Sequence, residues 1–200
     1  ALFIATIITI IATIIMLVLG KTGWPGEYQD CASYGACHCE AFHEDDWVLQ
    51  PTNTATNYFF VFFGLLMLYK LARDPPCDKP TMTGDDCPRN YNYFIGNNVF
   101  SVTFAAVSIF TGLSSAYFHA SMRAWGNILD VVGMYLFISF IPIYTIAKMT
   151  KKPEKWFIIV YFSLNILFAG VRVFIFQTHL RLLIFYIFMG LTVIVELYIY

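Results

Sequence analysis

The sequence predicts an all-α membrane protein, built as a helical bundle of about six transmembrane spans. Of its 200 residues, 58% are hydrophobic and 12% are charged, and the charged fraction of an average soluble domain is about 25%. A single soluble core of this size cannot bury so much apolar surface, so the excess must face lipid. The apolar runs are too long for barrel strands and do not alternate. A soluble enzyme, a nucleic-acid-binding protein and a disordered chain are therefore excluded.

The six predicted spans occupy residues 2–19, 54–72, 94–118, 128–147, 156–176 and 182–200. Each is long enough for a helix to cross a hydrocarbon core about 30 Å thick. The first span, which with Ala1 covers residues 1–19, is a transmembrane helix or a signal anchor. It is long for the apolar core of a signal peptide, so its length favours a helix. Residues 20–53 form a polar loop, and 54–200 hold the remaining spans. The chain begins and ends inside apolar runs, so we expect it to be part of a longer protein.

The Lys and Arg residues predict the orientation of the spans. Alternate loops carry eight basic residues on one side of the membrane and three on the other. Because basic loops stay in the cytosol, the 20–53 loop is predicted to be non-cytosolic. Its residues Cys31, Cys37 and Cys39 would permit one disulfide with one thiol left over, and their spacing differs from the common zinc pair. We expect a multi-pass protein of the endoplasmic reticulum, Golgi or plasma membrane.

Polar residues within or beside the spans are candidates for function, because they are costly in lipid. Ser115 and His119 lie one helical turn apart and share a face. Asp130 is predicted in the first turn of the next span, at the same membrane depth. We expect these residues to converge with Glu40, Asn53 and Asn57. Each also has a plainer interpretation, as a helix-bonded Ser, an interfacial His, an Asp favoured by the helix dipole, or capping and interhelical Asn residues.

Two sequence blocks resemble the alkaline ceramidase family, which belongs to the CREST superfamily of seven-helix membrane hydrolases. The first is Ser115-Ala-Tyr-Phe-His119, followed by Asp130 at the start of the next helix. The second is Cys39-Glu40, followed by Gln-Pro-Thr-Asn-Thr-Ala-Thr-Asn over residues 50–57. The resemblance covers roughly 39–200. It implies that 54–200 are a partial ceramidase-type domain with five family core helices, preceded by one N-terminal helix.

The resemblance also implies the roles of individual residues. His119 would be one of three zinc-binding His residues, Asp130 the general base and Ser115 the oxyanion or water ligand. The family's other two zinc ligands belong to its last two helices, which have no counterpart here, so the chain alone is expected to be inactive. Glu40 would act as a metal ligand or a positioning residue, and Asn53 and Asn57 would position the site through interhelical hydrogen bonds. Gln50 stands where animal enzymes have a Glu, which puts calcium binding in doubt.

The predicted function is a zinc-dependent membrane amidase that hydrolyses ceramide to a sphingoid base and a fatty acid. Its partners would be a ceramide-like lipid and the bilayer. The alternatives are another CREST-type lipid hydrolase, a GPI-remodelling enzyme, or a non-catalytic seven-helix receptor. A transporter using Arg172 and Asp130 would need internal repeats of broken helices, and the sequence has none.

Overall fold

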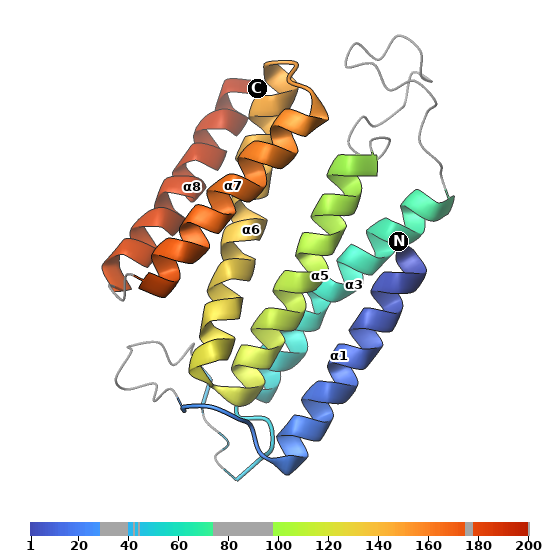
Figure 1. Ribbon diagram of the computed structural model, residues 1–200, viewed down its shortest axis with the longest axis vertical. Coiled ribbons are helices and arrows are strands. Elements are labelled where there is room, and N and C mark those ends of the chain that lie inside the picture. The colour runs from blue at the N-terminus through green and yellow to red at the C-terminus, as the bar shows by residue number, and fades with distance from the viewer. Residues whose placement is uncertain (29–39, 42, 44, 74–97, 175–177, 200) are drawn as a thin grey trace. The chain divides into compact units, whose positions relative to one another are not determined.

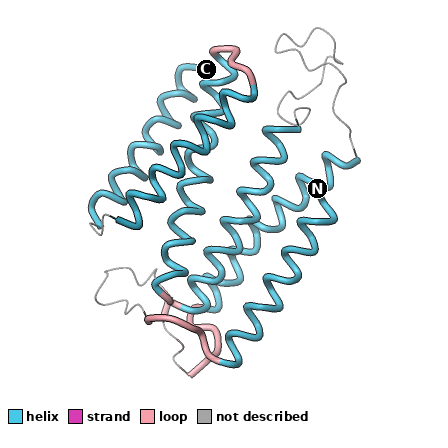
Figure 2. Tube along the Cα trace, viewed as in Figure 1, coloured by secondary structure: helices cyan, strands magenta, loops and turns pink. Residues whose placement is uncertain are grey.

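The computed structural model describes residues 1–28, 40–41, 43, 45–73, 98–174 and 178–199, in which the regular elements are helices (Figures 1 and 2). These helices are α1 (Leu2–Thr22), α3 (Pro51–Arg73), α5 (Asn98–Ser121), α6 (Ala124–Met149), α7 (Glu154–Phe174) and α8 (Thr178–Ile199). Within this part of the chain, five of them, all except α8, are long and apolar enough to cross a membrane. The predicted all-α membrane class is confirmed, and each predicted span corresponds to one helix.

Four helices begin earlier than predicted, α3, α6, α7 and α8, and for α3 and α6 the reason is local. Helix α3 begins at Pro51, which suits a first helical position because its missing N–H needs no partner there. Helix α6 begins at Ala124, in a stretch whose Gly and Asn hide the helix from a hydropathy count. The prediction that Asp130 lies in the first turn of its helix is therefore wrong, because that turn contains no acidic residue. Asp130 lies deeper in α6, where the dipole of the helix start does not account for it.

The chain divides into two compact units, which are described separately. The first unit comprises residues 1–68 and 105–133, and the second comprises 69–104 and 134–200. Helices α5 and α6 each contribute residues to both units. All the predicted site residues belong to the first unit.

In the first unit, glycine residues allow neighbouring helices to pack closely against one another. A Cβ atom on Gly112 of α5 would lie 2.7 Å from the backbone oxygen of Asn57 in α3. A Cβ atom on Gly133 of α6 would lie 2.7 Å from Ser114 Oγ, and the Gly133 carbonyl accepts a hydrogen bond from Thr111. Helices in lipid associate mainly through such close packing, which small residues permit. These contacts hold α3 and α6 directly against α5.

Helix α1 packs against α3 and α5 with one face and leaves the rest exposed. Met16 is buried in a cluster with Ala116 and Ala120. The Tyr117 hydroxyl donates to the carbonyl oxygen of Ala12, and Thr13 shares a hydrogen bond with Tyr58. Most of the other apolar side chains of α1 are exposed, as expected of a helix that faces lipid.

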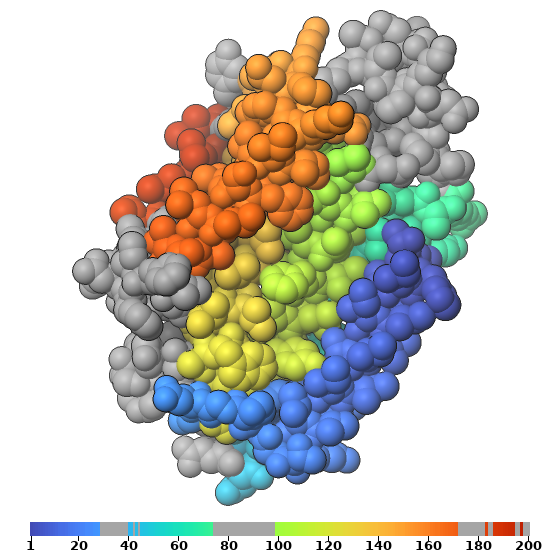
Figure 3. Space-filling model, viewed as in Figure 1, coloured from blue at the N-terminus to red at the C-terminus, as the bar shows by residue number. Residues whose placement is uncertain are grey.

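An N-terminal strap, residues 23–28, continues from α1 across the turn between α5 and α6 (Figure 3). The Trp125 indole donates to the Pro25 carbonyl, and the Arg123 guanidinium donates to the Gly26 carbonyl, both over 2.9 Å. The turn consists of Met122, whose φ of 47° is left-handed, and Arg123. The strap thus holds the short connection that sets the register between α5 and α6.

The second unit has an aromatic core. Phe100, Phe140, Phe157 and Tyr161 pack ring against ring, with centroids 4.9–5.7 Å apart. A buried polar pair lies beside them, in which Asn165 Nδ2 donates to Ser139 Oγ over 2.9 Å. Aromatic pairs of this geometry add about 0.5–1.5 kcal/mol each beyond their area burial.

Candidate functional site

The last turns of α5 present two of the predicted site residues. Ser115 and His119 are buried, each with 8% of its surface exposed, and the spacing of one helical turn puts them on the same face. The prediction that they share a face is therefore confirmed by the helix in which they lie.

Asp130 lies on the face of α6 that packs against α5. Gly126 and Gly133, on either side of it at helical spacing, approach Phe118 and Ser114 of α5. This register brings the Asp130 carboxyl group to Ser115, its side-chain hydrogen-bond partner. Asp130 is only 5% exposed, and its Oδ1 atom has no hydrogen-bond partner among the described residues. A buried acidic oxygen without a hydrogen-bond partner is costly, so this oxygen is a candidate for a functional role.

The His119 side chain is held by Gln50, which directly precedes α3. Its Nδ1 atom lies 2.6 Å from Gln50 Oε1. The backbones also pair, because the N–H of Gln50 donates to the His119 carbonyl over 3.1 Å and the N–H of Leu49 donates to Ala120. Gln50 has no exposed surface. It is not among the predicted site residues, and the signal that could have identified it is its position directly before the Pro51 helix start.

Glu40 forms the N-terminal cap of α3. Its two carboxylate oxygens accept hydrogen bonds from the backbone N–H groups of Thr52 and Asn53, both over 2.7 Å. Burial opposes ionisation, but the hydrogen bonds from Asn53 and Thr52 outweigh it and lower the pKa of Glu40 below its usual value. The observed contacts are those of a positioning residue.

Asn53 and Asn57 lie in the first two turns of α3. Asn57 Nδ2 donates to the Asn53 carbonyl over 2.9 Å, so this bond stays within the helix. The interhelical hydrogen bond expected of Asn57 is therefore not formed among the described residues, and its contact with α5 is instead the approach of its carbonyl oxygen to Gly112. The absence of a side chain on Gly112 leaves room for this approach.

The described residues include no group of three or more His, Cys, Asp or Glu side chains that could hold a metal ion. His119 is the predicted metal ligand among them. The predicted pattern of Cys31, Cys37 and Cys39 lies outside the described residues, as does the Arg172 side chain.

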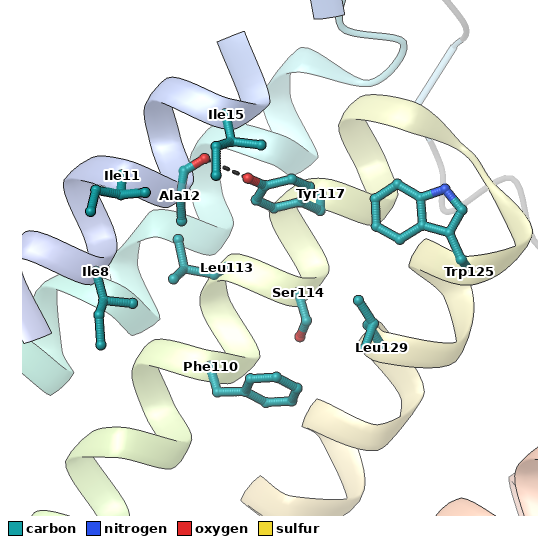
Figure 4. A pocket seen from close by; sticks show the side chains of 10 residues that line it. All are labelled: Ile8, Ile11, Ala12, Ile15, Phe110, Leu113, Ser114, Tyr117, Trp125 and Leu129. Atoms are coloured by element: carbon teal, nitrogen blue, oxygen red, sulfur yellow. Dashed lines mark hydrogen bonds between the residues drawn. The ribbon is translucent and has the colours of Figure 1, made fainter. Parts of the chain in front are cut away.

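A cavity of about 390 Å³ lies between α1, α5 and α6 (Figure 4). Its lining is almost wholly hydrocarbon, because the hydroxyl of Tyr117 and the indole N–H of Trp125 bond backbone carbonyls instead of facing the space. Ser114 also lines it, but its hydroxyl donates to the Thr111 carbonyl. The cavity therefore offers apolar contact and no chemistry, and it is distinct from the Ser115–Asp130 contact.

Comparison with known proteins assigns the chain to a family. A scan against protein-family models matches the ceramidase family over residues 38–200, which include Glu40, Gln50, Ser115, His119 and Asp130. A search of curated proteins and a search of solved structures each found no match. Since the family match covers most of the chain and contains every residue of the site, this multi-pass membrane protein belongs to the ceramidase family.

Proposed function

We propose that the protein takes part in zinc-dependent hydrolysis of the amide bond of ceramide, releasing a sphingoid base and a fatty acid. The family membership supports an amide hydrolase that acts on a lipid. The observation that carries the proposal for this chain is the buried pairing of Ser115 with an Asp130 carboxyl group, one oxygen of which has no partner among the described residues. His119 lies one turn of α5 further along.

His119 fits the role of one zinc ligand. Metal-bound His residues usually donate their other ring N–H to an acceptor that fixes the ring, and Gln50 Oε1 is such an acceptor. Zinc, when bound, would acidify a water molecule and polarise the substrate carbonyl. A catalytic zinc site needs about three protein ligands, so the proposal requires ligands besides His119.

Asp130 and Ser115 would carry out the proton transfer and the charge stabilisation. Asp130 would accept a proton from the attacking water as the oxygen adds to the amide carbon. It would then give that proton to the leaving nitrogen as the C–N bond breaks. The single hydrogen of the Ser115 hydroxyl is donated to the Asp130 carboxylate at rest. Once Asp130 holds the proton from the water, the Ser115 hydroxyl would be free to donate a hydrogen bond to the oxyanion that develops on the carbonyl oxygen. The direct contact between Ser115 and Asp130 suits these two roles, because both side chains must reach the same amide group of the substrate.

The membrane setting supports a substrate with long alkyl chains. Exposed apolar side chains on α1, α3 and α7 face lipid, so a bilayer substrate can approach without leaving the hydrocarbon. We also propose that the 20–53 loop is non-cytosolic, in keeping with the Lys and Arg distribution. Single Cys residues at the exposed positions Lys21 and Lys152, in a chain without other Cys, test this orientation. An impermeant thiol reagent applied from the cytosolic side should label only Lys152→Cys, and labelling of Lys21→Cys would contradict it.

The test of the function compares two His variants in the full-length protein. His119→Ala should lose bound zinc, measured by elemental analysis, and ceramide hydrolysis, measured by release of the fatty acid. His43→Ala is the matched control, because its ring is half-exposed and pairs with Asp46 instead of the site. It should keep both properties. Ceramide hydrolysis by His119→Ala at the wild-type rate would refute the proposal.

A further inference from the structure

The side chain of Gln50 connects two residues that are far apart in the sequence, Glu40 and His119. Its amide nitrogen donates to the Glu40 carbonyl oxygen over 3.3 Å, and its amide oxygen lies 2.6 Å from His119 Nδ1. The side chain is completely buried, so bulk water does not compete for either bond.

The direction of these hydrogen bonds follows from what each atom can do. A backbone carbonyl only accepts, so the Glu40 carbonyl must face the NH₂ group of Gln50. The amide oxygen is thereby turned toward His119, and it too only accepts. The Nδ1 atom of His119 must therefore carry the hydrogen. A neutral imidazole with its proton on Nδ1 has its lone pair on Nε2.

The frame around Gln50 is itself fixed. The carboxylate of Glu40 is bound to two backbone N–H groups at the start of α3, so its carbonyl has little freedom to turn. The backbone of Gln50 pairs with the His119 carbonyl, which sets the distance across which the two side chains meet. Replacing the amide by an apolar group would break both bonds without a substitute donor or acceptor.

We propose that Gln50 is a positioning residue that sets the tautomer of His119, so that Nε2 is the atom offered to a metal. Glu40 acts through Gln50, because its carbonyl decides which way the amide points. The metal part of this inference rests on the proposed function, whereas the tautomer is a property of the metal-free chain.

The tautomer can be measured directly by long-range ¹H–¹⁵N correlation spectra of the metal-free, full-length protein labelled with ¹⁵N-histidine. His119 is assigned by the signals that His119→Ala removes. The wild type should show a protonated Nδ1 and an unprotonated Nε2. Gln50→Leu should shift the proton to Nε2 or give a mixture, whereas Gln50→Glu, which keeps an accepting oxygen, should keep Nδ1 protonated. Asn165→Leu is the control for loss of a buried amide elsewhere, and it should leave the His119 signals unchanged.

The same variants are then titrated with zinc alone. Loss of an outer hydrogen-bond partner should weaken zinc affinity about 10–100-fold in Gln50→Leu, and Asn165→Leu should retain the wild-type affinity. An unchanged Nδ1–H tautomer in Gln50→Leu, or an Nδ1 atom without a proton in Gln50→Glu, would overturn the inference. The second variant keeps this test decisive if the first does not fold. A wild-type protein that binds no zinc would instead refute the proposed function, and this outcome is seen without any Gln50 variant.

Discussion

Two polar side chains are buried to the same extent, Asn165 in the second unit and Asp130 in the first, but they differ in the hydrogen bonds that they form among the described residues. In the second unit Asn165 donates to Ser139 Oγ and to the Tyr161 carbonyl, and the Tyr161 hydroxyl donates to the Leu136 carbonyl over 2.6 Å. In the first unit Asp130 is as deeply buried as Asn165, yet one of its oxygens has no partner among the described residues.

Asn165 joins two helices through its hydrogen bonds, whereas one oxygen of Asp130 joins nothing among the described residues, as the proposed role of a general base requires. Interhelical hydrogen bonds in a membrane contribute about 0.6–2 kcal/mol each. The Asn165 amide donates both of its hydrogens to protein acceptors, so its hydrogen bonds serve to stabilise the helix packing. An acidic oxygen left unpaired does the opposite, since it costs stability and gains nothing until a proton or a substrate arrives. The hydrogen bonds of these two side chains, which are similar in size, support a structural role for Asn165 and the catalytic role proposed for Asp130.

The strongest test of this comparison is Asp130→Asn, which keeps the shape of the side chain and removes its charge. We expect ceramide hydrolysis to fall by about 10²–10⁴-fold, because the general base is lost. The thermal unfolding midpoint should stay the same or rise, because the buried charge is gone. Fatty acid release and a thermal melt of the same preparation measure the two effects. A clear loss of stability with unchanged hydrolysis would reverse the role given to Asp130.

The reciprocal test is Asn165→Leu in the second unit. We expect the free energy of unfolding to fall by about 1–3 kcal/mol, because buried partners of the amide are left unsatisfied. The hydrolysis rate per folded molecule should not change, since Asn165 is not part of the site. Equilibrium unfolding in detergent gives the first quantity and an activity assay normalised to folded protein gives the second. If Asn165→Leu lost activity without losing stability, the contrast between the units would fail.

A third test compares two glycines, one at a tight contact between helices and one that faces open space. Gly112→Ala should destabilise the first unit by about 1–3 kcal/mol, as overpacking does, because its Cβ would lie 2.7 Å from the Asn57 carbonyl oxygen. Gly170→Ala is the control in the second unit, where a Cβ would meet nothing within 4 Å. It should be neutral or stabilise by up to about 1 kcal/mol through helix propensity. Thermal melts that ranked the two variants in the opposite order would show that the α3–α5 approach is not tight.

The smallest expected effect concerns the cap on α3. Because hydrogen bonds lower the pKa of folded Glu40, its carboxylate stabilises the folded state above the unfolded pKa. This stabilisation is lost as the pH falls through the lower, folded pKa. The wild type should therefore melt above Glu40→Gln at neutral pH, and the gap should close as the pH drops below the ordinary Glu value of 4.5. A gap that persisted or widened in acid would show that the charge of Glu40 does not support the cap.

The sequence predicts those features that depend on local patterns. Long apolar runs identify the helices, and the spacing of Ser115 and His119 puts them on one face. The depth of Asp130 was mispredicted because Ala124 to Asn127 belong to the helix without being strongly apolar. Gln50 could not be found as the partner of His119, because no local pattern connects residues so far apart in the chain. The hydrogen-bond state of each group is likewise visible only in three dimensions.

Helix α1 and the strap lie outside residues 38–200, the part of the chain that defines the family. A protein trimmed to the family boundary would lose the acceptors of Tyr117, Arg123 and Trp125, and the small-residue surface at Ala116 and Ala120 would be uncovered. The trimmed domain would then expose an apolar surface that favours aggregation, next to the turn that follows His119. The ends of an expressed domain should therefore be chosen from the contacts of α1, because residues 38–200, which match the family, leave out a helix that packs against α5.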